Sequence, residues 1–243
     1  MYNIDNFLFS KKEMYLLEHN KQGRSIELAQ KSHLFRRKKI YENMHLIDER
    51  MFAGGGFFPQ LHPYNGSVDF ELVSFVDRKK HSGTNEAVHF FLDDYRFRYA
   101  VWANLEKTTE SIFRFDYVFT PDFSLWVDLP TEYFNIMNIF RTRYVGAYWQ
   151  QCGLNVIPTV SWGNANSFHY AFCGLPQHSV LAVCGVGNKH CPASLELWKY
   201  AIKQIDKELL PTMIIVFGEE VEIPGINAPI KFVSDYISTH FRR

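Results

Sequence analysis

The chain has 243 residues, with 26 Lys and Arg balanced by 26 Asp and Glu, so its formal net charge is zero. Hydrophobic residues make up 47% of the sequence and charged residues 21%, which predicts a sizeable core and excludes wholesale disorder. The neutral balance argues against a protein that coats nucleic acid with its whole surface, although it leaves room for a local basic patch.

The sequence lacks several features that would assign it to a class of protein. No apolar run approaches the roughly 18 residues that span a bilayer, and residues 1–9 do not have the pattern of a secretory signal. The four cysteines form no CxxC pair and predict free thiols in a reducing compartment. Motifs of serine hydrolases, zincins, kinases and EF-hands are missing too. We therefore expect a cytoplasmic protein without a membrane partner.

Residues 1–66 differ in composition from the rest and predict a helical N-terminal appendage that ends in a glycine-rich hinge. Apolar positions over 13–28 form an uneven helical stripe. Glycines 54–56 lack the Lys and Ser/Thr of a phosphate-binding loop, so a turn or hinge is expected there. Four consecutive basic residues predict a solvated helix end, with contact to nucleic acid as the alternative: Arg36, Arg37, Lys38 and Lys39.

Residues 67–243 predict an α/β domain built on a mainly parallel sheet. Short apolar runs typical of buried strands occur at 71–76, 87–92, 117–120, 155–160, 179–184 and 212–217, with a weaker run at 230–233. Helical patterns over 131–151 and 194–210 lie between some of them. Strands that alternate with helices favour right-handed parallel crossovers. We favour a TIM-barrel-like or incomplete barrel, with 57–61 as a further strand; an open doubly wound sheet is the alternative.

Acidic residues follow several of the predicted strands. Asp93 follows the second run, Asp122 the third and Glu219 the sixth. Because parallel sheets gather functional groups at the carboxyl ends of their strands, these three carboxylates are the candidate catalytic residues. Such a cluster suits a general acid and base, and it also suits a divalent cation, so the cofactor stays open. The alternative is that each aspartate is an ordinary turn or N-cap residue.

Four more residues are candidates for ligand binding. Trp162 and Asn164 follow the fourth run and offer a flat ring beside an amide, which suits a base or a sugar; a Trp that fills the top of the core is the alternative. Arg141 and Arg143 lie two positions apart on the predicted helix 131–151, so they cannot share one face. At most one of them should point at the site, where its partner would be a phosphate or an aspartate.

Several segments together resemble the domain-of-unknown-function family four-four-one-seven: VHFFLDDYRF at 88–97, TPDFS at 120–124, RTRYVGAYW at 141–149, VIPTVSW at 156–162, FCG at 172–174 and the run 210–218. The resemblance covers roughly residues 70–220. The family is found in bacteriophages, plasmids and Gram-positive bacteria, so the resemblance implies a cytoplasmic setting in a phage or mobile element. It implies no particular reaction.

Two interpretations of function follow. The first is a hydrolase or transferase that acts on a nucleotide or nucleic acid, with its site at the carboxyl ends of the strands. The alternative is a non-catalytic factor that binds a host protein, a signalling nucleotide or DNA. The scaffold alone does not decide between them, because one fold supports many functions.

Overall fold

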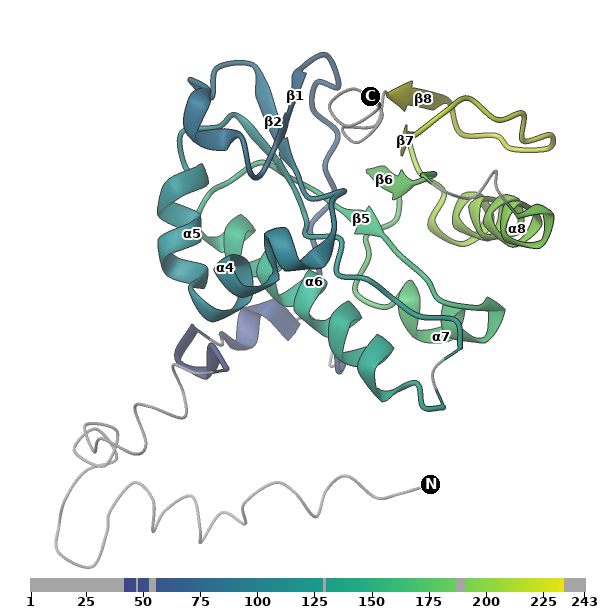
Figure 1. Cartoon of the computed structure of the whole chain (residues 1–243), viewed down its shortest axis with the longest axis horizontal. Coiled ribbons are helices and arrows are strands. Elements are labelled where there is room, and N and C mark those ends of the chain that lie inside the picture. Colours follow the sequence, from purple (N-terminus) through teal and green to yellow (C-terminus); the bar gives the residue numbers. More distant parts are fainter. Residues whose placement is uncertain (1–41, 47, 53–55, 129, 187–190, 234–243) are drawn as a thin grey trace, which may run out of the picture. The chain divides into compact units, whose positions relative to one another are not determined.

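The computed structural model of the chain describes residues 42–46, 48–52, 56–128, 130–186 and 191–233 (Figure 1). The chain divides into two compact units, Met1–Ile47 and Asp48–Arg243. The described part of the first unit holds one short 3-10 helix, η2 (Met44–Leu46). The predicted helix over 13–28 and the basic row from Arg36 to Lys39 lie outside the described residues, as do two of the three hinge glycines.

The second unit is built on two four-stranded sheets in which every neighbouring pair of strands is parallel. The first sheet holds, in order, β1 (Glu71–Ser74), β2 (Glu86–His89), β3 (Tyr117–Phe119) and β4 (Val156–Ile157). The second holds β5 (Thr159–Val160), β6 (Val180–Cys184), β7 (Met213–Phe217) and β8 (Ile230–Val233). These sheets confirm the mainly parallel α/β class.

The two sheets meet at Pro158, which separates β4 from β5. Proline has no N–H to donate to a ladder, so the single run expected over 155–160 is interrupted there. Its carbonyl still accepts a 2.9 Å bond from the backbone N–H of Ala182 in β6. On the other side, the backbone N–H of Thr159 donates to Oγ1 of Thr120 at 2.7 Å, just past β3. One short segment therefore links the edges of both sheets.

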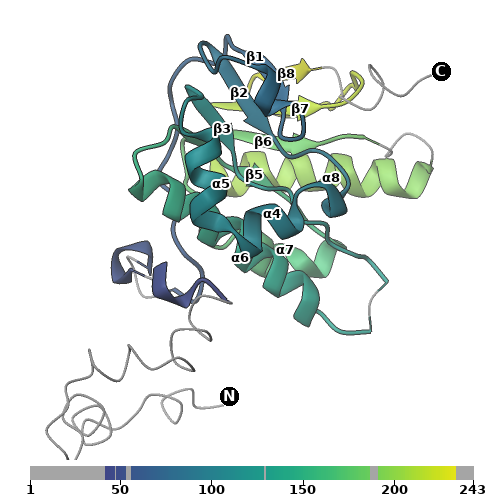
Figure 2. The same cartoon turned by 60° about the vertical axis from the view of Figure 1, so that its left-hand side comes forward.

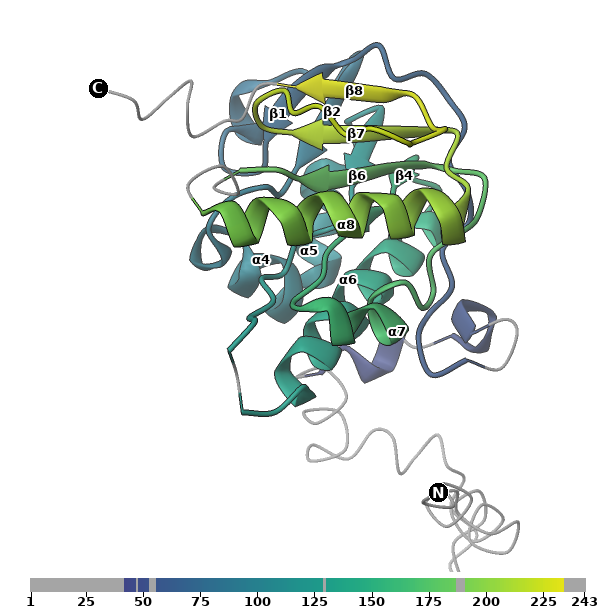
Figure 3. The ribbon, with the colours of Figure 1, turned by 90° about the vertical axis from the view of Figure 1, so that its right-hand side faces the viewer.

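Helices lie in most of the longer connections between strands, as is usual for parallel pairing. After β2 come the 3-10 helix η5 (Asp94–Arg96), α4 (Arg98–Ala103) and α5 (Leu105–Ile112), while α6 (Tyr133–Gln151) joins β3 to β4. Figure 2 shows α4, α5 and α6 gathered on one side of the first sheet. The connection from β5 to β6 carries η6 (Ala165–Ser167) and α7 (Phe168–Ala171). Helix α8 (Pro192–Leu209) runs beside β6 (Figure 3). The described residues also form η3 (Glu49–Phe52) and η4 (Arg78–Lys80).

An aromatic core lies between the two sheets. The ring of Phe217 in β7 contacts Phe91, just after β2, and Phe119 in β3, with centroid separations of 4.0 and 5.4 Å. Strands β2 and β3 belong to the first sheet and β7 to the second. The two sheets must therefore curve toward each other for these rings to meet. The outer strands approach as well, because Nζ of Lys231 in β8 donates to the carbonyl of Val68 at 2.5 Å.

The barrel itself is not confirmed. Among the strand pairs of the described chain, none joins β1 to β8, so closure by backbone pairing stays a prediction. The expected additional strand at 57–61 is wrong, because that segment forms no strand. Pro59 lacks a donor, and the N–H of Gln60 is taken by the carbonyl of Met51 at 2.6 Å.

Helix α6 also differs from its expected pattern. The apolar stripe of the sequence predicts that Tyr133 and Ile136 are buried, but Tyr133 is 60% exposed and Ile136 is exposed too. Polar side chains of the same helix, Asn135 and Asn138, are buried instead. The physical reason is the loop that packs against this face, whose backbone groups need hydrogen-bond partners.

None of the helices in the part of the chain that the structure describes is both long and apolar enough to cross a membrane.

Candidate functional site

A pocket of about 370 Å³ lies at the carboxyl ends of β3, β5 and β6. Val160 is the last residue of β5 and Cys184 the last of β6. The lining residues are Asp122, Ser124, Leu125, Val160, Ser161, Trp162, Cys184, Val186 and Trp198. The volume lies within the range of about 300–1,000 Å³ that is usual for small-molecule sites. The pocket therefore occupies the edge of the sheet where the sequence predicts the site.

Asp122 is the carboxylate of this lining. Its Oδ1 accepts a 2.5 Å hydrogen bond from the hydroxyl of Ser161, which follows β5. The pKa of Asp122 is raised from the ordinary 3.8 to about 6, mainly because the group is buried. The hydrogen bond from Ser161 lowers this pKa, and the negative charge of Asp94 raises it. A carboxyl group with a pKa near 6 can hold or release a proton close to neutral pH.

Asp94, rather than Asp93, is the second carboxylate near Asp122. Its Oδ1 accepts hydrogen bonds from the backbone N–H and the hydroxyl of Ser124, at 3.1 and 2.9 Å. Its Oδ2 forms a 2.5 Å ion pair with Arg98, one turn along the chain. Ser124 thus connects this ion pair to the pocket.

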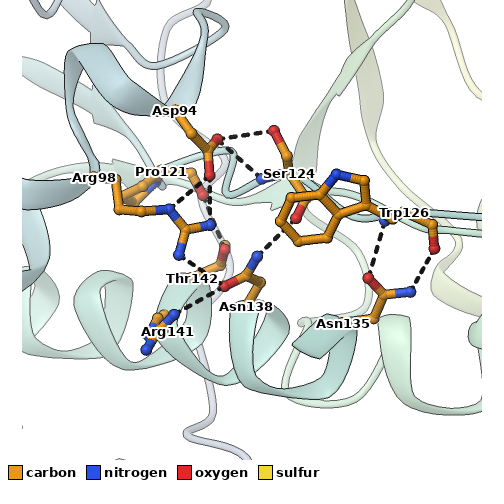
Figure 4. Close-up of polar contacts among 9 residues, drawn as sticks. All are labelled: Asp94, Arg98, Pro121, Ser124, Trp126, Asn135, Asn138, Arg141 and Thr142. Carbon is orange, nitrogen blue, oxygen red and sulfur yellow. Dashed lines mark hydrogen bonds and ion pairs between the residues drawn. The ribbon is translucent and has the colours of Figure 1, made fainter. Parts of the chain in front are cut away.

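A ladder of polar side chains on α6 holds the loop after β3 (Figure 4). Thr142 donates to the carbonyl of Pro121 at 3.0 Å, and Asn138 donates to the carbonyl of Ser124 at 2.7 Å. Asn135 donates to the carbonyl of Trp126 at 2.7 Å and accepts from its N–H at 3.0 Å. Residues 135, 138 and 142 share one helix face. The loop 121–126 is therefore fixed at three places and presents Asp122 to the pocket.

Neither of the two candidate arginines lines the pocket. Arg141 donates to Oδ1 of Asn138 at 3.1 Å, and its guanidinium lies 5.2 Å from the ring centre of Trp102. Arg143 is fully buried. Its guanidinium donates to the carbonyls of Thr159, Ala171 and Cys173 at 3.2, 2.6 and 3.0 Å, and burial lowers its pKa to about 9. It ties α6 to β5 and to the end of α7.

The other sequence candidates divide between the pocket and its surroundings. Trp162 lines the pocket, as its predicted role requires. Asn164 is the N-cap of η6, and its side chain accepts from the N–H of Asn166 at 2.9 Å. Asp93 is the N-cap residue of η5 and 59% exposed, with an Arg96 nitrogen 3.7 Å away. Glu219 is exposed after β7. The structure thus brings Asp122 and Trp162 together, and leaves Asp93, Asn164 and Glu219 outside the lining.

The sequence prediction includes Asp122 and Trp162 but misses the other lining residues, of which Trp198 and Ser161 make hydrogen bonds at the pocket. Trp198 belongs to α8 and follows the apolar stripe of that helix, so its pattern indicates core; its indole N–H donates to the carbonyl of Cys184 at 2.7 Å. Ser161 directly precedes Trp162 and follows the predicted strand at 155–160. Its position at the carboxyl end of that strand could have identified it as a site residue. Across the described residues, no group of three His, Cys, Asp or Glu side chains is arranged to hold a metal ion.

Comparisons with known proteins place residues 56–236 under one family model, described as a domain of unknown function (DUF4417). The Gene 1 protein of Mycobacterium phage L5 is 35% identical over 133 residues, which are 55% of this chain and 57% of that protein. The Gene 1 protein of Mycobacterium phage D29 is 32% identical over 143 residues, 59% of this chain and 52% of that protein. The chain thus matches little more than half the length of these curated relatives. No solved structure matches it.

Proposed function

This chain belongs to the DUF4417 family of phage-associated proteins of unknown function, and we propose that it is a hydrolase or transferase that acts on a nucleotide or nucleic acid. In this proposal the pocket at the carboxyl ends of the strands binds the nucleobase. The carboxyl group of Asp122 acts as the general acid and the general base.

The observation that carries the proposal is the position of the Asp122 carboxyl group. It is hydrogen-bonded to Ser161 inside a pocket that also holds the indoles of Trp162 and Trp198. Indole rings offer flat apolar area on which a base can pack, and base–aromatic stacking contributes about 1–3 kcal/mol per base. The pocket therefore combines a surface for a planar ring with one proton-transfer group.

A single carboxyl group can catalyse hydrolysis, because it can take a proton from water in one step and give that proton to the leaving group in the next. The ionised Asp122 takes a proton from water while the water oxygen bonds to the electrophilic atom of the substrate. The protonated Asp122 then gives that proton to the leaving group as the old bond breaks. In group transfer, the hydroxyl of an acceptor molecule replaces the water.

A second function is favoured by one feature of the lining. Among the described residues that line the pocket, Asp122 is the single carboxylate, whereas many acid–base enzymes use a pair. A binding factor that holds a signalling nucleotide needs recognition and no proton transfer. In that case Asp122 is a hydrogen-bond acceptor for the ligand.

One experiment separates these functions. The purified chain is titrated by calorimetry with nucleosides, nucleotides and short single-stranded DNA and RNA, and the same mixtures are analysed for products by chromatography. Asp69→Asn is a matched control, because Asp69 is exposed before β1, at the opposite edge of the sheet. We expect binding and product formation that Asp122→Asn abolishes and Asp69→Asn preserves. Binding without product would indicate the binding factor; no binding would contradict both functions.

A further inference from the structure

We infer that the base bound in the pocket is guanine, recognised through the hydrogen-bond donors on one edge of its ring. This inference rests on the second of the proposed functions, the binding factor in which Asp122 accepts hydrogen bonds from the ligand, and it specifies that ligand. It comes from the hydrogen bonds that the lining residues already make within the protein.

Three of the polar side chains that line the pocket have their hydrogens engaged. The hydroxyl of Ser161 donates to Asp122, and the hydroxyl of Ser124 donates to Asp94. The indole N–H of Trp198 donates to the carbonyl of Cys184. A hydroxyl whose hydrogen is used can still accept through its oxygen. The two serines therefore offer acceptors to a ligand.

Asp122 adds two acceptor oxygens when ionised. Oδ1 receives the Ser161 hydroxyl, and a carboxylate can accept further bonds at both oxygens, including a bidentate pair. A ligand that brings donors can pair with these acceptors. A ligand without donors would cover the Asp122 carboxylate and leave it without a new partner, at a cost of about 1–3 kcal/mol or more for a charged group.

The described part of the lining offers no cation to a phosphate. Among the nine lining residues that the structure describes, none is Lys, Arg or His, and a phosphate carries negative charge and only acceptor oxygens. Arg98, the basic residue connected through Ser124, is already ion-paired with Asp94 at 2.5 Å. These described residues therefore favour the base of a nucleotide over its phosphate as the part that enters.

Guanine fits these requirements better than the other bases do. Its ring N1–H and its exocyclic N2 amino group are adjacent donors on one edge, so both can face one carboxylate. Adenine and cytosine place a single amino donor beside a ring acceptor, and uracil flanks its one ring donor with two acceptors. Two bonds to a charged acceptor favour guanine by geometry as well as by energy.

The test uses ligands that differ by single groups. Calorimetry on the full chain compares guanosine with inosine, which lacks the N2 amino group, and with adenosine and uridine. We expect inosine to bind roughly 10- to 100-fold more weakly than guanosine, the loss expected for one hydrogen bond to a charged group. Adenosine and uridine should bind more weakly still.

A change of specificity provides the second arm. Asp122→Asn replaces one acceptor oxygen with a donor and keeps the side-chain shape, so it should lose guanosine and gain xanthosine, which has an oxygen in place of the N2 amino group. Asp69→Asn should bind like the unaltered chain, and circular dichroism checks that both variants fold. Equal binding of inosine and guanosine, or guanosine binding that survives Asp122→Asn, overturns the inference. If another base binds in a way that depends on Asp122, guanine is wrong and the proposed function stands; if no nucleoside or nucleotide binds, both fail.

Discussion

The hydroxyl of Ser161, just past β5, donates to Oδ1 of Asp122, in the loop after β3, over 2.5 Å. This bond stabilises the ionised carboxylate and opposes the effect of burial on its pKa. We predict that Ser161→Ala raises the pKa of Asp122 above its value of about 6. Carbon-13 NMR titration of the carboxyl groups would measure the change.

Ser124→Ala is the control for this titration, because the Ser124 hydroxyl bonds to Asp94 and not to Asp122. It should move the pKa of Asp122 less than Ser161→Ala does. A downward shift in Ser161→Ala, or an equal shift in both variants, would contradict the role assigned to the Ser161 hydrogen bond.

The raised pKa of Asp122 has a consequence for stability. Its folded-state pKa of about 6 lies above its ordinary value of 3.8, so the folded chain binds the proton more tightly than the unfolded chain. Ionised Asp122 therefore destabilises the fold above pH 6, by an amount on the order of 3 kcal/mol, and this penalty disappears as the pH falls below about 4. Asp122→Asn cannot ionise and should unfold at higher urea concentration than the unaltered chain at pH 8.

At pH 4 the stability gained by Asp122→Asn should be much smaller, because both side chains are then neutral. Urea denaturation at the two pH values measures the difference, and Asp69→Asn shows the effect of removing an exposed charge. The interpretation that ionised Asp122 destabilises the fold would be wrong if Asp122→Asn were less stable than the unaltered chain at pH 8.

Thr142 tests whether α6 positions the loop that carries Asp122. Its hydroxyl donates to the carbonyl of Pro121 at 3.0 Å, and the residue is buried. Thr142→Val keeps the shape and leaves that carbonyl without this donor, so we expect a loss of about 1–3 kcal/mol in the free energy of unfolding. We also expect weaker ligand binding, although Thr142 does not line the pocket.

Thr142→Ser is the matched variant, since it keeps the hydroxyl and removes one methyl group, with an expected loss of about 1 kcal/mol. Binding affinity should follow the hydroxyl: weakened in Thr142→Val and retained in Thr142→Ser. Equal affinity in both variants would show that the α6 ladder stabilises the fold without positioning the site.

The fold was predictable from sequence wherever burial was uniform. Strand β6 and strand β7 are continuous apolar runs, and each is buried along most of its length, so hydrophobicity alone locates them. Helix α8 has one apolar stripe between Pro192 and Leu209, and its bounds lie close to the prediction. The edge of the sheet that holds the pocket followed from the parallel topology.

The parts that were missed depend on tertiary hydrogen bonds. Asp93 and Asp94 are adjacent in sequence, and the turn into η5 decides which of them reaches Ser124. Arginine side chains usually lie at protein surfaces. Arg143 is nevertheless buried, because three backbone carbonyls accept hydrogen bonds from its guanidinium. No periodic pattern in the sequence records where those carbonyls lie.

Hydrogen bonds and packing of residues 60–65 bear on where the folded unit begins. The sequence places the appendage at 1–66, and its separability remains a prediction, but the segment 60–65 is bonded to the α/β domain. The N–H of Leu61 donates to the carbonyl of Gly174 at 2.9 Å, and the N–H of Tyr64 donates to the hydroxyl of Ser179 at 2.9 Å. The ring of Tyr64 is part of the aromatic core.

We therefore expect a chain of residues 48–243 to unfold cooperatively, with a free energy of unfolding close to that of the full chain. A chain of residues 67–243 loses the buried Tyr64 side chain, and loss of a large core side chain costs about 3–5 kcal/mol. It should aggregate or unfold at much lower urea concentration. Circular dichroism during urea denaturation compares the three chains. Failure of 48–243 to fold would show that the first unit is required, and a stable 67–243 would show that the segment 48–66 contributes little to the core.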